Sequence, residues 1–221
     1  EQGRPFKETD PLGGYDPYSA SKAEAEILIA SYRSAFFNAA DYGKKHRTLV
    51  ASARAGNVIG GGDFAKDRLI PDCLRAFQAA HSVSIRNPQA VRPWQHVLEP
   101  LGGYLQLGVQ LLRGKVACAG PWNFGPAEGE AQPVKRVVQC LAEKWGKGAS
   151  VRLDQGEHPH EAKYLLLNSA KAKKILHWHP RWSNETALAK VVAFHKAWLS
   201  KEDMRQVCSA QIQEYSEGCS R

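Results

Sequence analysis

A tyrosine and a lysine four residues apart are the pair in this sequence best suited to chemistry. Tyr18 and Lys22 belong to the run Tyr-Ser-Ala-Ser-Lys, in a segment predicted to be helical from Tyr18 to about Phe37. At that spacing the two side chains share one face of a helix. An ammonium group beside a phenol favours the phenolate, so the pair predicts a general base for an alcohol undergoing oxidation. The same spacing also occurs on ordinary helix surfaces.

The rest of the chain alternates predicted helices with short predicted strands. Residues 48–54 have the apolar composition of a buried strand, and residues 56–62 are predicted to form a glycine-rich turn. Alternation of this kind predicts an α/β fold. A polar segment at 201–221 is expected to be an appended helix or a frayed tail. Further helices are expected at 71–80, 97–112, 133–145, 169–176 and 184–199, and further strands at 83–85 and 122–124.

Charge and cysteine usage narrow the classes of partner and compartment. The net charge of +8 favours an anionic partner, either nucleic acid or a phosphorylated small molecule, and the basic residues form no dense block. The five cysteines are scattered without a CxxC pair, which predicts reduced thiols in a cytoplasmic protein. The four histidines 158, 160, 177 and 179 match no zinc spacing, so no metal is expected. No apolar run is long enough to span a membrane.

Four motifs occur in the order in which the extended short-chain dehydrogenase/reductase family has them. Residues 15–26 resemble its active-site helix, and residues 54–60 are similar to its R-x-x-N-V-x-G segment. Residues 92–97 resemble its R-x-(W/F)-x-x-V motif, and residues 122–125 its N-x-G strand end. Within the family, the chain is most similar up to about Trp198 to the 4,6-dehydratases that act on CDP-glucose. The stretches that carry this finer resemblance are 10–18, 54–63, 85–88, 92–101 and 158–162.

The resemblance implies a partial Rossmann-type doubly wound sheet with a smaller C-terminal α/β substrate-binding domain. Residues 1–60 would be the last elements of the dinucleotide-binding domain, including the helix of Tyr18. Residues 61–200 would mainly bind the nucleotide sugar, with some Rossmann elements interleaved. Residues 201–221 would be a tail. A homodimer is also implied, through the helix of Tyr18 and a neighbouring helix.

The activity implied by the resemblance is that of a lyase that uses NAD transiently. The sugar, CDP-glucose in the leading interpretation, would be oxidised at C4 while Tyr18 takes the hydroxyl proton. The C4 ketone acidifies the C5 proton, water leaves from C6, and hydride returns to C6. The product is a 4-keto-6-deoxy nucleotide sugar. The partners expected are therefore a nucleotide sugar and NAD, with neither nucleic acid nor a membrane.

Candidate binding residues come from the motif positions. Asn57 lies just past a predicted strand, at the end where open α/β sheets bind ligands. Arg68 and Arg92 carry guanidinium groups that match diphosphate oxygens. A turn residue and two surface ion pairs are the plainer alternatives, as is a solvated acid at Glu161. The cofactor residues implied are Tyr18, Lys22, Arg54 and Asn57, and the substrate residues are Asn57, Arg68, Arg92, Glu161 and Tyr164.

One element of the complete family pattern has no counterpart in these residues. The sequence contains no G-x-x-G-x-x-G fingerprint at a strand-to-helix turn, and the family's acid/base pair for eliminating water is expected before Glu1. The chain is therefore expected to be the C-terminal part of a longer enzyme and inactive by itself. Two alternatives stay open: a nucleotide-sugar 4-epimerase, which uses the same tyrosine and lysine, and a truncated binding module without turnover.

Overall fold

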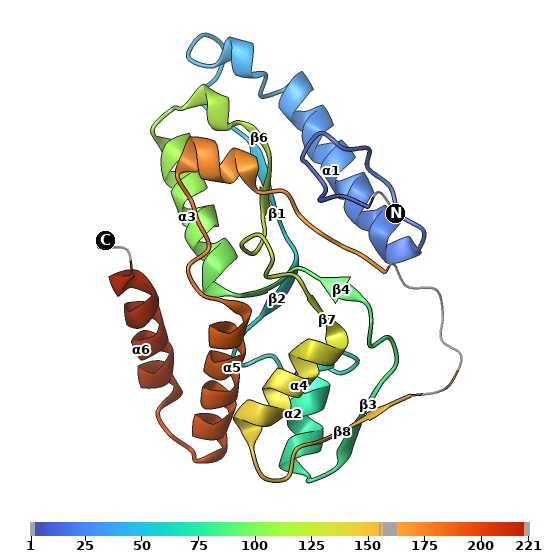
Figure 1. Ribbon diagram of the computed structural model, residues 1–221. Helices are drawn as coiled ribbons and strands as arrows, with labels where there is room; N and C mark the ends of the chain where they lie inside the picture. Colours follow the sequence, from blue (N-terminus) through green and yellow to red (C-terminus); the bar gives the residue numbers. More distant parts are fainter. Residues whose placement is uncertain (1–2, 155, 157–162, 219–221) are drawn as a thin grey trace.

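The structure is a computed structural model that describes residues 3–154, 156 and 163–218. Figure 1 shows helices arranged around short strands in the middle of the molecule. The helices are α1 (Pro17–Ala35), α2 (Leu69–Gln78), α3 (Leu98–Leu112), α4 (Val134–Trp145), α5 (Asn184–Leu199) and α6 (Met204–Glu217). The strands are β1 (Ala51–Ala55), β2 (Asn57–Ile59), β3 (Ser82–Ile85), β4 (Val91–Arg92), β5 (Trp94–His96), β6 (Gly120–Phe124), β7 (Gln132–Pro133) and β8 (Ser150–Leu153).

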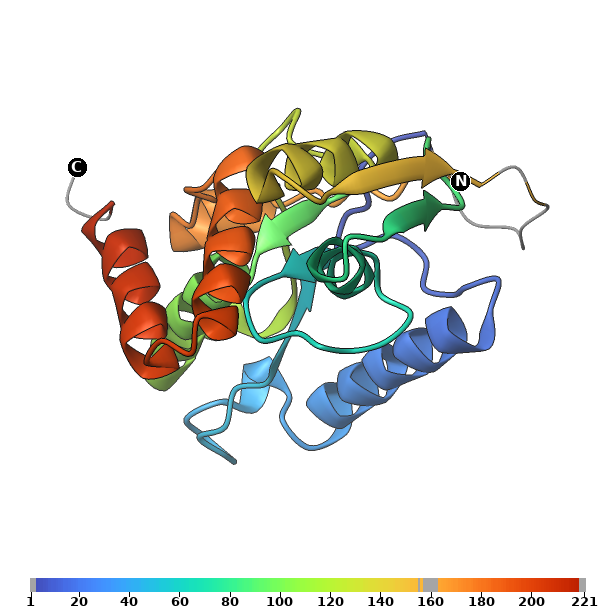
Figure 2. The ribbon, with the colours of Figure 1, turned by 90° about the horizontal axis from the view of Figure 1, so that it is seen from below.

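The helix predicted around Tyr18 is α1, and its start is fixed by local chemistry. The Asp16 carboxylate accepts a hydrogen bond from the Ser19 backbone N–H at 3.0 Å, and Pro17 occupies the first turn, where its missing N–H costs nothing. Ala23 is the helix's one buried residue. In both Figure 1 and Figure 2, α1 lies at the edge of the molecule, apart from the other helices.

Three of the four strand pairs are parallel, as an α/β fold requires. Strand β1 pairs with β6, β2 with β5 and β3 with β8, whereas β4 and β7 are antiparallel. Parallel neighbours need a crossover connection, and between β1 and β6 the chain forms α2 and α3. The α/β class predicted from the alternating elements is confirmed.

The prediction of a glycine-rich turn over residues 56–62 was wrong in its first half. Residues 57–59 form β2, which pairs with β5 in the register Asn57 to Trp94. Gly56 permits this pairing, because a Cβ at that position would lie 2.4 Å from Cγ of Pro93. The glycine serves close approach of two strands, so only the glycines after β2 belong to the turn.

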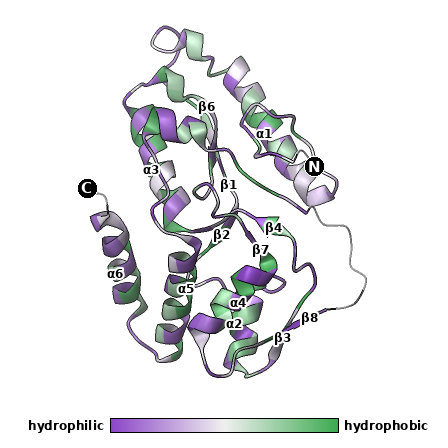
Figure 3. Ribbon diagram, viewed as in Figure 1, coloured by the Kyte–Doolittle hydropathy of each residue, from purple (hydrophilic) through white to green (hydrophobic). Residues whose placement is uncertain are grey.

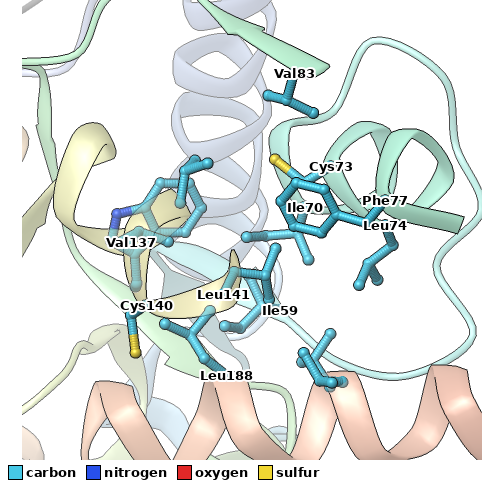
Figure 4. Close-up of a cluster of buried hydrophobic side chains, with 14 of the residues drawn as sticks. Ile59, Ile70, Cys73, Leu74, Phe77, Val83, Val137, Cys140, Leu141 and Leu188 are labelled. Atoms are coloured by element: carbon cyan, nitrogen blue, oxygen red, sulfur yellow. The ribbon is translucent and has the colours of Figure 1, made fainter. Parts of the chain in front are cut away.

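The larger hydrophobic core lies where α2, α4 and α5 meet β2, β3 and β5. Figure 4 shows side chains from α2, α4 and α5 turned toward one another. Burial raises the pKa of the Cys73 thiol to about 12, so Cys73 packs there as a small neutral group. The fully or almost fully buried members include Ile70, Cys73, Leu74, Phe77, Val137, Val138, Leu141, Leu188 and Val191.

A second core cluster joins α3 to β6 and to the segment before α5. Trp122 and Phe124 of β6 pack here with Leu107 of α3 and with Trp178. Both indole N–H groups find partners: Trp122 donates to the Cys118 carbonyl at 2.8 Å, and Trp178 donates to the Glu99 carbonyl at 3.1 Å. The aromatic rings therefore add directional contacts to the apolar packing.

The final segment forms helix α6, one of the two outcomes expected for it. Its Tyr215 is buried, and the hydroxyl donates to Glu99 Oε2 at 2.9 Å. Glu99 is 0% exposed and also accepts from the backbone N–H groups of Arg181 and Trp182. The last helix is thereby joined to the first turn of α3.

Candidate active site

Tyr18 and Lys22 are stacked on the first turns of α1. Lys22 Nζ lies 5.5 Å from the centroid of the Tyr18 ring, which bears out the expected shared face. Tyr18 is 71% exposed, so its hydroxyl is open to a ligand. An ammonium group over a phenol ring can favour a developing phenolate and can donate hydrogen bonds to a diol.

Arg54 lies at the carboxyl end of β1 and forms an ion pair with α1. Its Nη2 donates to Glu26 Oε2 at 2.7 Å, and the Ser52 hydroxyl donates to the same oxygen at 2.9 Å. The hydrogen bond from Arg54 is the main cause that lowers the pKa of Glu26, against the opposing effect of burial. At neutral pH this is a charged, half-buried pair between helix and strand.

Asn57 on β2 lies beside the segment that follows Arg92 of β4, although β2 pairs with β5 and β4 pairs with β7. The Asn57 backbone N–H donates to the Pro93 carbonyl at 3.1 Å, which holds β2 beside the segment that follows Arg92. Arg92 is largely buried on β4, and its Nη1 donates to the Val91 carbonyl at 2.9 Å. The structure therefore brings two of the predicted substrate residues to one region.

Tyr164 adjoins the same region through backbone pairing. The Val91 N–H donates to the Lys163 carbonyl at 2.8 Å, and the Leu165 N–H donates to the Val91 carbonyl at 3.1 Å. Tyr164 is more than half exposed. Arg68 precedes the first residue of α2 and is exposed, without a side-chain hydrogen bond to the helix end. Glu161, the predicted ribose ligand, lies outside the described residues, as do His158 and His160.

The predicted residues thus fall into two groups. The first group, at α1 and β1, contains Tyr18, Lys22 and Arg54, and the second, around β2 and β4, contains Asn57, Arg92 and Tyr164. Arg54 and Asn57 are separated by only two residues and connect the groups along the chain. Over the described ranges, no group of three His, Cys, Asp or Glu side chains is placed to hold a metal ion. No helix in that part of the chain is long and apolar enough to cross a bilayer.

Three buried or partly buried polar residues, Glu26, His96 and Glu99, were not predicted. Glu26 follows Lys22 by four residues, so its place on the Tyr18–Lys22 side of the helix was a usable signal. His96 of β5 is 1% exposed, and burial lowers its pKa to about 4, with a smaller contribution from the charge of Lys190. Glu99 is enclosed in the network described above, and burial is the main cause that raises its pKa. Neither burial was signalled by the sequence.

The sequence matches a family model over residues 1–191, and that model is described as GDP-mannose 4,6 dehydratase. This chain belongs to that family. A CDP-glucose 4,6-dehydratase of Salmonella typhimurium is 48% identical over 216 residues, which cover 98% of this chain and 60% of the Salmonella protein. A dTDP-glucose 4,6-dehydratase of Streptomyces griseus is 25% identical over 198 residues, 55% of its length. This family member therefore spans little more than half the length of these relatives.

Solved structures of similar fold include both dehydratases and epimerases. The dTDP-glucose 4,6-dehydratase of Bacillus anthracis, in complex with NAD, has a TM-score of 0.70 at 21% identity, covering 89% of this chain and 57% of that one. A UDP-glucuronic acid 4-epimerase of Bacillus cereus has a TM-score of 0.72 at 18% identity, covering 90% of this chain and 58% of that one. These likenesses confirm the expected Rossmann-type α/β fold.

Proposed function

We propose that this family member supplies the proton-transfer helix and the sugar-nucleotide site of a CDP-glucose 4,6-dehydratase. The observation that carries the proposal is the stacked Tyr18–Lys22 pair on the capped helix α1. The 48% identity to the Salmonella enzyme, across 98% of this chain, supports CDP-glucose as the substrate. The surplus of positive charge suits a nucleoside diphosphate sugar.

The described residues fit one end of an NAD site. The Tyr18 hydroxyl and the Lys22 ammonium are exposed donors that suit the hydroxyls of a ribose. The sequence has no G-x-x-G-x-x-G fingerprint, the turn at which a pyrophosphate approaches a helix N-terminus in dinucleotide-binding folds. When bound, NAD supplies the acceptor for a hydride and returns it later. This chain would hold the nicotinamide ribose but not the phosphates.

In the proposed reaction the chain's residues bind, orient and move a proton. Tyr18, as the phenolate, takes the proton of the sugar C4 hydroxyl, and the ammonium of Lys22 stabilises the negative charge on the phenolate oxygen. The guanidinium groups of Arg68 and Arg92 would bind the diphosphate, and the Asn57 amide would bind a hydroxyl or phosphate oxygen. Elimination of water from C5 and C6 needs an acid and a base that none of these residues provides.

A nucleotide-sugar 4-epimerase is the second candidate, because the fold is equally similar to that class. The TM-scores of 0.70 and 0.72 do not separate the two activities. Both would use Tyr18 and Lys22 in the same way. The product separates them, because a dehydratase product has lost one water and an epimerase product keeps the mass of the substrate.

The test combines this chain with the part of the Salmonella dehydratase that it does not cover. CDP-glucose and NAD⁺ are added to the mixture, to each part alone and to a mixture containing Tyr18→Phe, and products are followed by mass spectrometry. We expect a product lighter by one water only in the first mixture. A product of unchanged mass that is a C4 epimer would favour the epimerase. No conversion, together with no CDP-glucose binding by this chain, would refute both.

We further propose that the complete protein is a cytoplasmic homodimer with α1 at its interface. Ile27, Leu28 and Phe36 on α1 are each more than half exposed, although they are large and apolar. Apolar side chains on a helix face support contact with a second helix. The buried free thiols Cys73, Cys118 and Cys140 are compatible with a reducing compartment.

A further inference from the structure

Helix α1 is attached to the rest of the molecule chiefly through one carboxylate. Among its described residues only Ala23 is buried, and its large apolar side chains are mostly exposed. Two of its charged groups, Glu26 and Arg33, are only partly exposed, and Glu26, whose side chain is 17% exposed, is bonded to β1. Hydrophobic packing therefore holds α1 weakly, and the polar contact has a large share in deciding where the helix lies.

The contact has two donors that come from the same side of β1. Ser52 and Arg54 are two residues apart, so their side chains leave the strand on one face, and both donate to Glu26 Oε2. A shift of the strand by one residue would turn both donors away. A step of one residue along α1 would move the carboxylate by about 1.5 Å and about 100° around the axis. The two hydrogen bonds to Glu26 thus fix the position of α1 along β1 and its rotation about the helix axis.

The position of α1 along β1 matters because the helix and the strand run in opposite directions in Figure 1. Tyr18 precedes Glu26 by eight residues, which is about 12 Å along a helix at about 1.5 Å per residue. Asn57 follows Arg54 by three residues, across the bend at Gly56, which is at most about 10 Å at about 3.3 Å per residue. Because α1 and β1 run in opposite directions, Tyr18 and Asn57 lie in the same direction from the contact between Glu26 and Arg54. Tyr18 and Asn57 therefore lie on the same side of the contact, beyond the carboxyl end of β1.

We propose that Glu26 is a positioning residue, whose bonds from Arg54 and Ser52 set Tyr18 and Lys22 past the carboxyl end of β1, on the side of Asn57. Arg54 acts through this pair rather than by touching the cofactor. The catalytic role of Tyr18 and Lys22 rests on the proposed function, whereas the part that Glu26 has in placing α1 does not. Glu26 neither binds substrate nor exchanges a proton with it.

The test measures amide hydrogen exchange of the whole chain, without sugar or cofactor. In Glu26→Gln and Arg54→Gln we expect exchange of the α1 amides to rise about tenfold or more, because a partly buried charge loses its counter-charge. The amides of β1 and β6 should keep their protection. The double variant should exchange no faster than the worse single variant, because the two residues act as one pair. Ser52→Ala should raise α1 exchange by a smaller amount. It is the variant to measure if the others fail to fold.

A matched control and a signal at Tyr18 complete the test. Glu185→Gln removes a carboxylate paired with Lys144 at 3.1 Å between α5 and α4, and it should leave α1 exchange unchanged. With fluorotyrosine incorporated, the Tyr18 signal, assigned by Tyr18→Phe, should move or broaden in Glu26→Gln, while the signals of tyrosines far from α1 in the sequence, such as Tyr104 and Tyr215, stay.

Two results would overturn the proposal. One is unchanged α1 exchange with an unchanged Tyr18 signal in Glu26→Gln. The other is a uniform rise in exchange across α1, β1 and β6, which would make the pair a general stabiliser. If the mixture described above converts CDP-glucose, Glu26→Gln should lower kcat about tenfold while KM for CDP-glucose stays within about twofold. The exchange result decides the proposal even if no conversion occurs.

Discussion

His96 is a neutral imidazole enclosed within the fold. Its Nδ1 accepts a hydrogen bond from the Leu98 N–H at 3.3 Å, and its ring lies against Trp182 with centroids 4.8 Å apart. An accepting Nδ1 places the ring proton on Nε2. Protonation of Nδ1 would break this contact and bury a charge, which is why burial holds the pKa near 4.

This burial predicts a dependence of stability on pH between about 4 and 6.5. The folded pKa of His96 is about 4 and the unfolded one is 6.5, so in that interval the unfolded state takes up the proton first. The free energy of unfolding should fall as pH drops through it, by up to about 3 kcal/mol from this residue. Urea titrations of the wild type and His96→Gln at several pH values measure the difference. A difference that stays constant from pH 7 to pH 4 would contradict the assignment.

The hydroxyl of Tyr215 is one of three donors to the buried Glu99 carboxylate. Tyr215→Phe removes the 2.9 Å bond to Glu99 and keeps the ring contacts with Trp182 and Arg181. We expect the free energy of unfolding to fall by about 1–3 kcal/mol, measured by urea titration at pH 7. Tyr32→Phe, on the exposed side of α1, is the control and should change it by less than about 0.5 kcal/mol. Equal effects of the two substitutions would show that the bond contributes nothing.

At the scale of elements, helix α3 carries three glycines, and two of them, Gly103 and Gly108, have opposite surroundings. A Cβ at Gly103 would lie 2.3 Å from ring atoms of Phe124 in the second core cluster. A Cβ at Gly108 would meet nothing within 4 Å. Gly103 therefore permits the close packing of α3 on β6, whereas Gly108 only weakens the helix.

Alanine at these two positions should act with opposite signs. Gly103→Ala should destabilise by about 1–3 kcal/mol or more, because Phe124 is fully buried and cannot move away. Gly108→Ala should stabilise by about 0.5–1 kcal/mol through helix propensity. Thermal unfolding followed by circular dichroism measures both, and each variant is the other's control. A stable Gly103→Ala would show that α3 can shift on β6.

The longer helices were predictable from the sequence, and several short strands were not. Asp16 and Pro17 mark the start of α1, and hydrophobic periodicity gave the helices from α2 to α5 to within a few residues. Strands β2, β4, β5 and β7 are two or three residues long and owe their existence to partners far along the chain.

Part of the candidate site was predictable because it depends on residues close together in the sequence. Tyr18 and Lys22 are neighbours on one helix, so their spacing was enough. The buried contacts of Glu26 and Glu99 were not predictable, because a carboxylate on a helix is usually solvated and its partners here lie 26 to 116 residues away. The catalytic and binding roles of all the predicted site residues stay predictions: Tyr18, Lys22, Arg54, Asn57, Arg68, Arg92, Glu161 and Tyr164.

At the scale of the whole molecule, apolar surface is concentrated on two helices. Figure 3 shows hydrophobic segments along both α1 and α3. On α3 the exposed side chains recur every three or four residues, which makes a stripe along one side, and Leu112 at its end is 90% exposed. Stripes of this kind are contact surfaces for other protein segments. The members of the α3 stripe are Leu101, Leu105, Val109 and Leu112.

We expect the isolated chain to self-associate through these surfaces. Sedimentation velocity should show larger species as the protein concentration rises, because each association removes apolar area from water. Leu105→Gln with Leu112→Gln should shift the distribution toward the monomer without lowering the unfolding midpoint. Leu107→Gln, in the core of the same helix, should lower the midpoint instead. A wild-type chain that stays monomeric at all concentrations would contradict the expectation.

The bond between Glu99 and Tyr215 also sets an order of events during synthesis. The two residues are 116 positions apart, and ribosomes add about 5–20 residues per second, so the carboxylate waits on the order of ten seconds for its hydroxyl. Arg181 and Trp182, its other donors, are also made long after it. During that wait the start of α3 cannot be enclosed, because an acid buried without donors is costly. The nascent chain must therefore keep this junction open to water, and to chaperones, until its last helix has been made.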